Sequence, residues 1–258
     1  MLHQFYHVVP YSWPLLLQYL ALLSVVSACG AVGARYVRNA ESGATDDIRV
    51  VLSATLTLLA LVVGFAFSLA IGGYNARQAN EAMEANRIES AFFKAELLPG
   101  EDAGKVRGLL RQYLDARLRF YQTGHGRQTD ELAGNANLLR SQMWAIVARN
   151  AGRQPNPVAV LPVSAMSDLL GSYENSTASW RSQIPPAAWG LITALAAFCS
   201  ALIGYSAGVR NHRGLLVVFP AVISISLALI ADIDVPGRGL IHVSPDNLAR
   251  VARLIAGA

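Results

Sequence analysis

The stretch from Leu59 to Tyr74 contains no charged residue, and it continues without a proline into a polar segment with helical spacing. It is the second half of a longer apolar run that begins near Val50. A run of about 20 apolar residues is long enough to cross the hydrocarbon core of a bilayer. We therefore predict a single helix that leaves a membrane and continues into water.

The composition agrees with a membrane protein. Only 15% of the residues are charged and 53% are hydrophobic, whereas soluble domains carry about a quarter charged residues. The charge deficit is concentrated in four apolar windows. The net charge of +4 does not indicate nucleic acid as a partner, because arginines near helix ends are typical of membrane proteins and no Lys/Arg-rich run is present.

The order of apolar and polar segments predicts an all-α integral membrane protein. Apolar spacing in the polar segments is helical throughout, and no window alternates as a strand would. The predicted parts are transmembrane helices at 13–36 and 50–71, a helical extramembrane domain at 72–186, transmembrane helices at 187–207 and 214–231, and a C-terminal tail at 232–258 with a short amphipathic helix.

The first apolar run has a second interpretation, as a secretory signal. The sequence from Val26 to Cys29 resembles a lipoprotein cleavage site. The residues before the run include no Lys or Arg, however, and signal peptides need a positively charged start. We interpret the run as a retained transmembrane helix.

Four spans place both termini and the polar insert on one side of the membrane. The short loops carry Arg35, Arg38, Arg49, Arg210 and Arg213, but arginines also flank the spans on the other side. Since long extramembrane domains are poorly counted by the positive-inside rule, charge alone leaves the orientation open.

No pattern for catalysis or metal binding is present. Cys29 and Cys199 both lie in apolar runs, where a thiol is usually a small packing residue. The five histidines lack metal-ligand spacing, and there is no nucleophile elbow, phosphate loop or metal-binding helix motif. We expect no metal, no cofactor and no enzymatic activity.

Thr57, Leu61, Phe65 and Ser68 recur every three or four residues, so they share one face of the second predicted span. Gly64, Ser68 and Gly72 on this face form a small-xxx-small ridge that would let two helices approach closely. The other interpretation is a pore lining, in which Leu61 and Phe65 form an apolar constriction. Spacing alone favours the packing ridge.

Asp232, Asp234 and Pro236 mark the turn at the exit of the last span. The simpler interpretation is a turn that closes the helix, with Arg238 as a partner. An ion or partner site is the alternative. Residues two apart point to different faces of a helix, so a shared acid–base pair is not expected.

Two motifs carry a resemblance to a known family. The segment GFAFSLAIGGYNARQANEAMEANRIESAFFKAELLP and the later ADIDVPGRGLIHVS resemble a bacterial family of small membrane proteins called bestrophin-like. The wider resemblance is to bestrophins, which are homopentameric anion channels. They have four membrane helices per subunit, a cytosolic helical domain between the second and third, and cytosolic termini.

This resemblance implies roles for specific residues. It would place Thr57, Leu61 and Phe65 at the apolar neck of the channel, although Thr57 departs from the family's apolar pattern. The exit Asp234–Gly237 is similar to the family's acidic-x-Pro-Phe-Gly turn but lacks the Phe. No counterpart of the calcium-binding acidic run is present, so no calcium gating is expected.

The resemblance shifts the preference for the second span from packing ridge to pore. The expected function is an oligomeric, pentameric channel for chloride or other small anions, with its own copies and the lipid bilayer as partners. The expected location is the bacterial inner membrane, with insert and termini on the cytoplasmic side. The alternative is a non-conducting membrane scaffold or sensor whose helical insert binds a protein partner.

Overall fold

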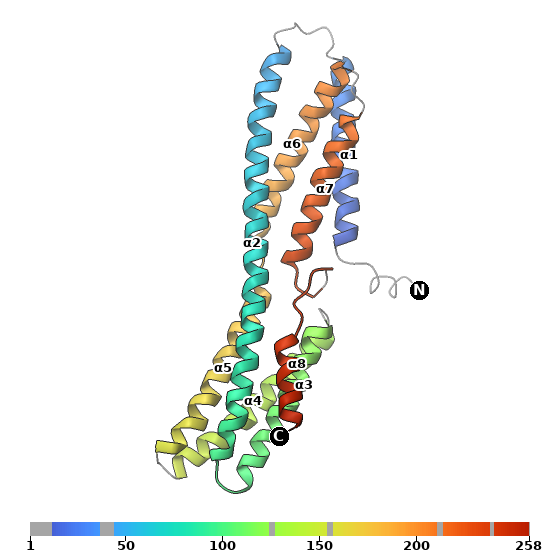
Figure 1. The fold of residues 1–258 in the computed structure, drawn as a ribbon. Helices are drawn as coiled ribbons and strands as arrows, with labels where there is room; N and C mark the ends of the chain where they lie inside the picture. Colours follow the sequence, from blue (N-terminus) through green and yellow to red (C-terminus); the bar gives the residue numbers. More distant parts are fainter. Residues whose placement is uncertain are drawn as a thin grey trace, which may run out of the picture. The chain divides into compact units, whose positions relative to one another are not determined.

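A computed structural model describes residues 12–36, 44–123, 127–153, 157–210, 214–237 and 240–257 (Figure 1). No strand occurs in these ranges, and the predicted all-α fold is confirmed. The helices are α1 Ser12–Tyr36, α2 Ala44–Lys94, α3 Glu101–Thr123, α4 Arg127–Arg153, α5 Val160–Arg181, α6 Pro186–Arg210, α7 Leu215–Asp234 and α8 Asp246–Ala256, with 3₁₀ turns η2 Ala95–Leu97 and η3 Pro157–Ala159.

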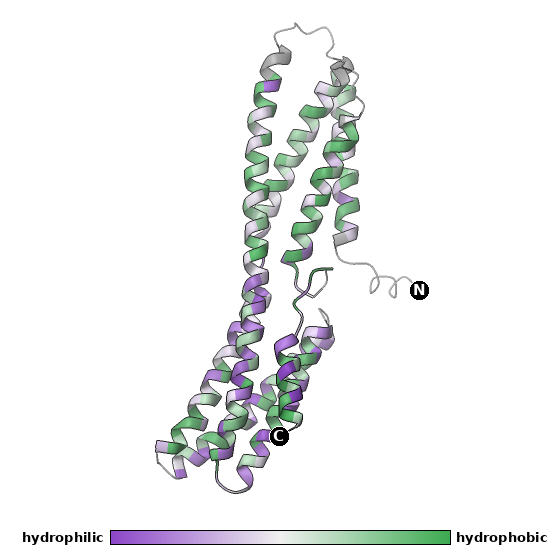
Figure 2. Cartoon of the chain, viewed as in Figure 1, coloured by the Kyte–Doolittle hydropathy of each residue, from purple (hydrophilic) through white to green (hydrophobic). Residues whose placement is uncertain are grey.

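Four helical stretches are long and apolar enough to cross a membrane. They are Trp13–Ala34, Ile48–Leu97, Pro157–Ala207 and Leu216–Asp234, and each overlaps one predicted span. Figure 2 shows the same division, since α1, α6, α7 and the first part of α2 are mainly hydrophobic. The part of α2 that follows is mainly hydrophilic.

The chain folds into two compact units, and the division falls between Gly72 and Gly73, inside α2. The membrane unit contains α1, α2 up to Gly72, α6 and α7, and the polar unit contains the rest of α2 with α3, α4, α5 and α8. The 51 residues of α2 form one helix, about 75 Å long at 1.5 Å per residue. The prediction of one helix running from an apolar into a polar segment is confirmed. The helix ends before Pro99 and Gly100, where Gly100 has a positive φ of 59°.

The membrane unit is held together by a close crossing of α1 and α6. A Cβ atom added to Gly30 would overlap the carbonyl of Ala201, and one added to Gly204 would overlap the backbone of Ser27. The Ser27 hydroxyl also donates a hydrogen bond to the Ser200 carbonyl at 3.0 Å. Small residues allow membrane helices to pack backbone to backbone in this way.

The polar unit has its own apolar core, which includes the buried side of α8. The sequence predicts an apolar face of α8 made by Leu248, Val251, Leu254 and Ile255. Leu248, Val251 and Ile255 are buried in this core, whereas Leu254 is 37% exposed. The carboxylate of Glu81 on α2 accepts hydrogen bonds from the backbone N–H of Leu248 at 2.9 Å and from the Asn247 amide at 2.7 Å. Glu81 therefore satisfies the Leu248 N–H, a backbone donor in the first turn of α8 that has no partner within that helix.

Candidate functional site

The four residues predicted for a pore lie on an exposed face of α2. Thr57, Leu61, Phe65 and Ser68 are all exposed in the single chain, with 53% of Leu61 and 62% of Phe65 accessible. The side of α2 that packs within the membrane unit carries Leu59, Ala66 and Ala70, which are buried. Ser68 follows Leu59 by nine residues, and nine steps of about 100° bring it to the opposite side of the helix. Thr57, Leu61 and Ser68 thus point away from the packed face, and Phe65, six residues after Leu59, lies about 120° from Leu59 around the helix.

The small-xxx-small ridge on this helix contacts no other part of the described chain. A Cβ atom added to Gly64 or Gly72 would meet nothing within 4 Å. The close crossing of small residues is between α1 and α6, through Gly30 and Gly204, and sequence reasoning missed it. The ridge on α2 is therefore available for contact with something outside this chain.

The exposed face carries hydroxyl groups but no charge. No charged residue occurs between Arg49 and Arg77. The hydroxyl of Thr57 donates a hydrogen bond to the carbonyl of Ser53, one turn earlier, at 3.0 Å. Its single proton is thus already used, so it presents a methyl group and oxygen lone pairs outward.

The two aspartates at the end of α7 are buried and bind backbone donors. Asp232 accepts hydrogen bonds from the N–H groups of Leu240 at 3.0 Å and Ile241 at 2.8 Å. Asp234 accepts one from the N–H of Ile184 at 3.0 Å. The two carboxylates hold different segments, as expected for residues two apart: Asp234 fastens the segment before α6, and Asp232 fastens the segment after α7.

Pro236 is buried in the turn that follows α7, and Gly237 has a positive φ of 76°. The proposed partner Arg238 lies outside the described residues, as does Arg38. The side chains of Arg35, Arg210 and Arg213 are also outside them.

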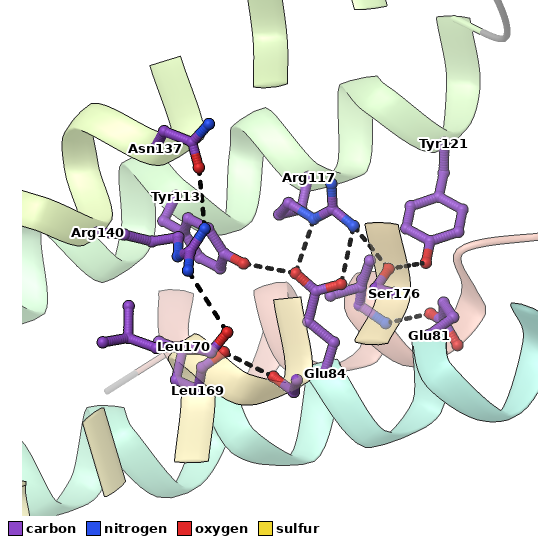
Figure 3. A network of polar contacts seen from close by, with 12 residues as sticks. Glu81, Glu84, Tyr113, Arg117, Tyr121, Asn137, Arg140, Leu169, Leu170 and Ser176 are labelled. Atoms are coloured by element: carbon purple, nitrogen blue, oxygen red, sulfur yellow. Dashed lines mark hydrogen bonds and ion pairs between the residues drawn. The ribbon is translucent and has the colours of Figure 1, made fainter. Parts of the chain in front are cut away.

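The polar unit contains a buried network of polar side chains that the sequence did not indicate (Figure 3). Arg117 of α3 donates hydrogen bonds to both carboxylate oxygens of Glu84 on α2, at 2.7 and 2.9 Å. Tyr113 donates to the same carboxylate at 2.5 Å. Arg117 also donates to the Ser176 hydroxyl of α5 at 2.9 Å. The network therefore joins α2, α3 and α5 through groups removed from water.

The charges in this network stabilise one another. The side chains of Glu84 and Arg117 are 0% and 2% exposed. Burial alone would lower the pKa of Arg117, but the adjacent Glu84 outweighs it and raises that pKa above its ordinary value. Burial, followed by the negative charge of Glu84, raises the pKa of Tyr113. Arg117 therefore stays protonated and Tyr113 stays neutral, so both remain donors to Glu84.

Three members of the network share one side of α3. Tyr113 and Arg117 are four residues apart on the apolar stripe of α3, and Tyr121 comes four residues later. An arginine within an apolar stripe is the feature of the sequence that could have indicated a buried polar network here. Within the part of the chain that the structure describes, no group of three or more His, Cys, Asp or Glu residues could hold a metal ion.

Comparison with known proteins gives one family and one fold. The family profile for the bestrophin-like domain matches residues 20–248. The crystal structure of a membrane protein matches with a TM-score of 0.65 and 12% identity, covering 94% of this chain and 97% of that chain. At that identity the match shows a shared fold and nothing more. No curated protein matches the sequence at a significant level.

Proposed function

Since the chain belongs to the bestrophin-like family, we propose that it assembles into an oligomeric, pentameric channel that conducts chloride or other small anions. The α2 helices of the copies surround the axis, with Thr57, Leu61, Phe65 and Ser68 facing the pore. The observation that carries this proposal is the position of these four residues on α2. All four are exposed, on the side of the helix away from the residues that pack within the membrane unit.

The uncharged face of α2 suits a hydrophobic constriction. Leu61 and Phe65 are the large apolar side chains of this face, one helical turn apart. A narrow apolar ring of such residues limits conduction because water leaves it readily. By analogy with bestrophins, we also propose that the protein lies in the bacterial inner membrane, with the polar unit and the termini on the cytoplasmic side.

The test is ion flux through the purified protein in liposomes. We expect chloride or iodide efflux, and we expect Leu61→Ala or Phe65→Ala to change it severalfold, because smaller side chains widen the apolar ring and the wider ring stays hydrated. Phe67→Ala is the matched control, since Phe67 is also exposed on α2 but lies about 160° around the helix from Phe65. Well-folded oligomers that pass no anion would reject the proposal.

The second candidate is a non-conducting scaffold or sensor whose polar unit binds a protein partner. It is favoured by large apolar side chains exposed on the polar unit, among them Phe93, Leu97 and Val160. The mass of the detergent-solubilised assembly separates the two candidates. A monomer or dimer cannot surround a pore with five copies of α2, so it would favour the scaffold.

A further inference from the structure

A groove of about 500 Å³ lies between α3 and α4 in the polar unit. On α3 it is lined by Gly104 and Gly108, which are one helical turn apart. A Cβ atom added to either glycine would meet nothing within 4 Å, so both leave open space. The groove is open to solvent over most of its extent.

The walls of this groove are apolar and its rim is polar. Leu109, Ile146 and Ala145 form the walls. The rim carries two amides and two cations, from Gln112, Gln142, Lys105 and Arg149. No Asp or Glu lines the groove.

The two cations differ in how far they are neutralised. Lys105 forms an ion pair with Glu101 at 3.1 Å, outside the groove lining. Arg149 is exposed and forms no hydrogen bond or ion pair with any residue that the structure describes. Arginine donates paired hydrogen bonds in the geometry that a carboxylate accepts. The rim therefore offers an uncompensated positive charge beside an apolar trough.

We propose that this groove binds a long-chain fatty acid, with its acyl chain over Gly104 and Gly108 and its carboxylate at Arg149. Apolar walls match the chain, and a cationic rim without acidic residues matches the head group. This site is independent of the channel proposal, because it lies wholly within the polar unit and requires no conduction.

The test uses photoreactive palmitic acid with the full-length protein in phosphatidylcholine nanodiscs, at a pH where the carboxylate is ionised. Mass spectrometry locates the adducts. We expect them on peptides covering 104–112 and 142–149, and we expect unlabelled palmitate to compete at least about tenfold better than hexadecanol, which lacks the charge.

Two substitutions separate the chain site from the head-group site. Gly108→Leu fills the trough and should reduce labelling of these peptides at least tenfold, whereas Gly171→Leu, at an exposed glycine with equally open surroundings on α5, should leave it unchanged. Arg149→Gln should weaken palmitate about fivefold and leave hexadecanol unaffected. Circular dichroism and the thermal midpoint verify that each variant is folded.

Adducts found only on α1, α2, α6 or α7 would overturn the proposal, because they would report lipid-facing contact. Labelling that survives in folded Gly108→Leu would overturn it as well. Equal competition by palmitate and hexadecanol would show that Arg149 recognises no head group.

Discussion

Arg117 and Glu84 form a bidentate ion pair in the core of the polar unit, with nitrogen–oxygen distances of 2.7 and 2.9 Å. The pair is surrounded by aromatic rings, and the guanidinium carbon of Arg117 lies 4.6 Å from the centre of the Phe120 ring. Because Glu84 belongs to α2, this pair fixes the rotation of the polar half of that helix against α3.

Removing one member of the pair should be costly. Glu84→Gln leaves the Arg117 charge buried without its counter-ion, so we expect a loss of about 3–5 kcal/mol in the free energy of unfolding. Chemical unfolding followed by tryptophan fluorescence measures it. The control is Glu174→Gln, because the Arg140–Glu174 pair has a 67% exposed carboxylate and should contribute at most about 1 kcal/mol. Equal losses in the two variants would contradict a special role for the buried pair.

The phenol of Tyr113 should make stability depend on pH in the alkaline range. Its pKa is raised by burial and by Glu84 above the ordinary value of 10.0, so the unfolded chain loses this proton at lower pH than the folded protein does. The hydrogen bond to Glu84 therefore contributes fully below pH 10 and is progressively offset above it.

Tyr113→Phe isolates this effect. At pH 8 the variant should be less stable by about 1.5–3 kcal/mol, the contribution of a hydrogen bond to a charged group. Above pH 10 the difference from the unchanged protein should shrink. Unfolding curves at pH 8, 9, 10 and 10.5 provide the measurement, and a difference that stays constant through pH 10.5 would disagree with the raised pKa.

The crossing of α1 and α6 predicts a sharp contrast between neighbouring glycines. Gly30→Ala places a methyl group against the Ala201 carbonyl, and Gly204→Ala places one against Ser27. Each should lower the stability of the membrane unit by about 1–3 kcal/mol, the usual cost of overpacking. Gly33→Ala is the matched control on α1, because its added methyl meets nothing within 4 Å. In thermal unfolding in detergent, the midpoint temperature of Gly33→Ala should be well above those of Gly30→Ala and Gly204→Ala.

Substitution of Asp232 can show whether this carboxylate only binds backbone N–H groups or also forms an ion site. Both of its carboxylate oxygens accept backbone hydrogen bonds, and Asp232→Asn turns one acceptor into a donor that faces an N–H group. We expect a loss of about 1–3 kcal/mol and faster amide exchange at Leu240 and Ile241. Added calcium, magnesium or sodium should not change the thermal midpoint. A cation that stabilises the unchanged protein but not the variant would instead support an ion site.

The small residues of the ridge on α2 lie on its exposed face, so they do not pack against another described helix of the same chain. The spacing of Gly64, Ser68 and Gly72 favours a packing ridge when only the sequence is considered. In the folded chain no described residue covers Gly64 or Gly72, and Phe65 is 62% exposed. The ridge and the predicted pore face are therefore parts of one surface that the single chain leaves free, and its role in assembly is a proposal.

Local periodicity was enough to predict the helices and the apolar stretches, because both depend on residues within a few turns of one another. The all-α fold, the long α2 helix and the buried stripe of α8 follow from that information, and so does the shared face of Thr57, Leu61, Phe65 and Ser68. The partners of Glu84, Glu81 and Asp232 do not. Each of these carboxylates binds groups that are distant in sequence or beyond the end of its helix, and only the packing of helices brings them together. The same is true of the crossing at Gly30 and Gly204, since a glycine in an apolar run looks the same whether another backbone lies against it or not.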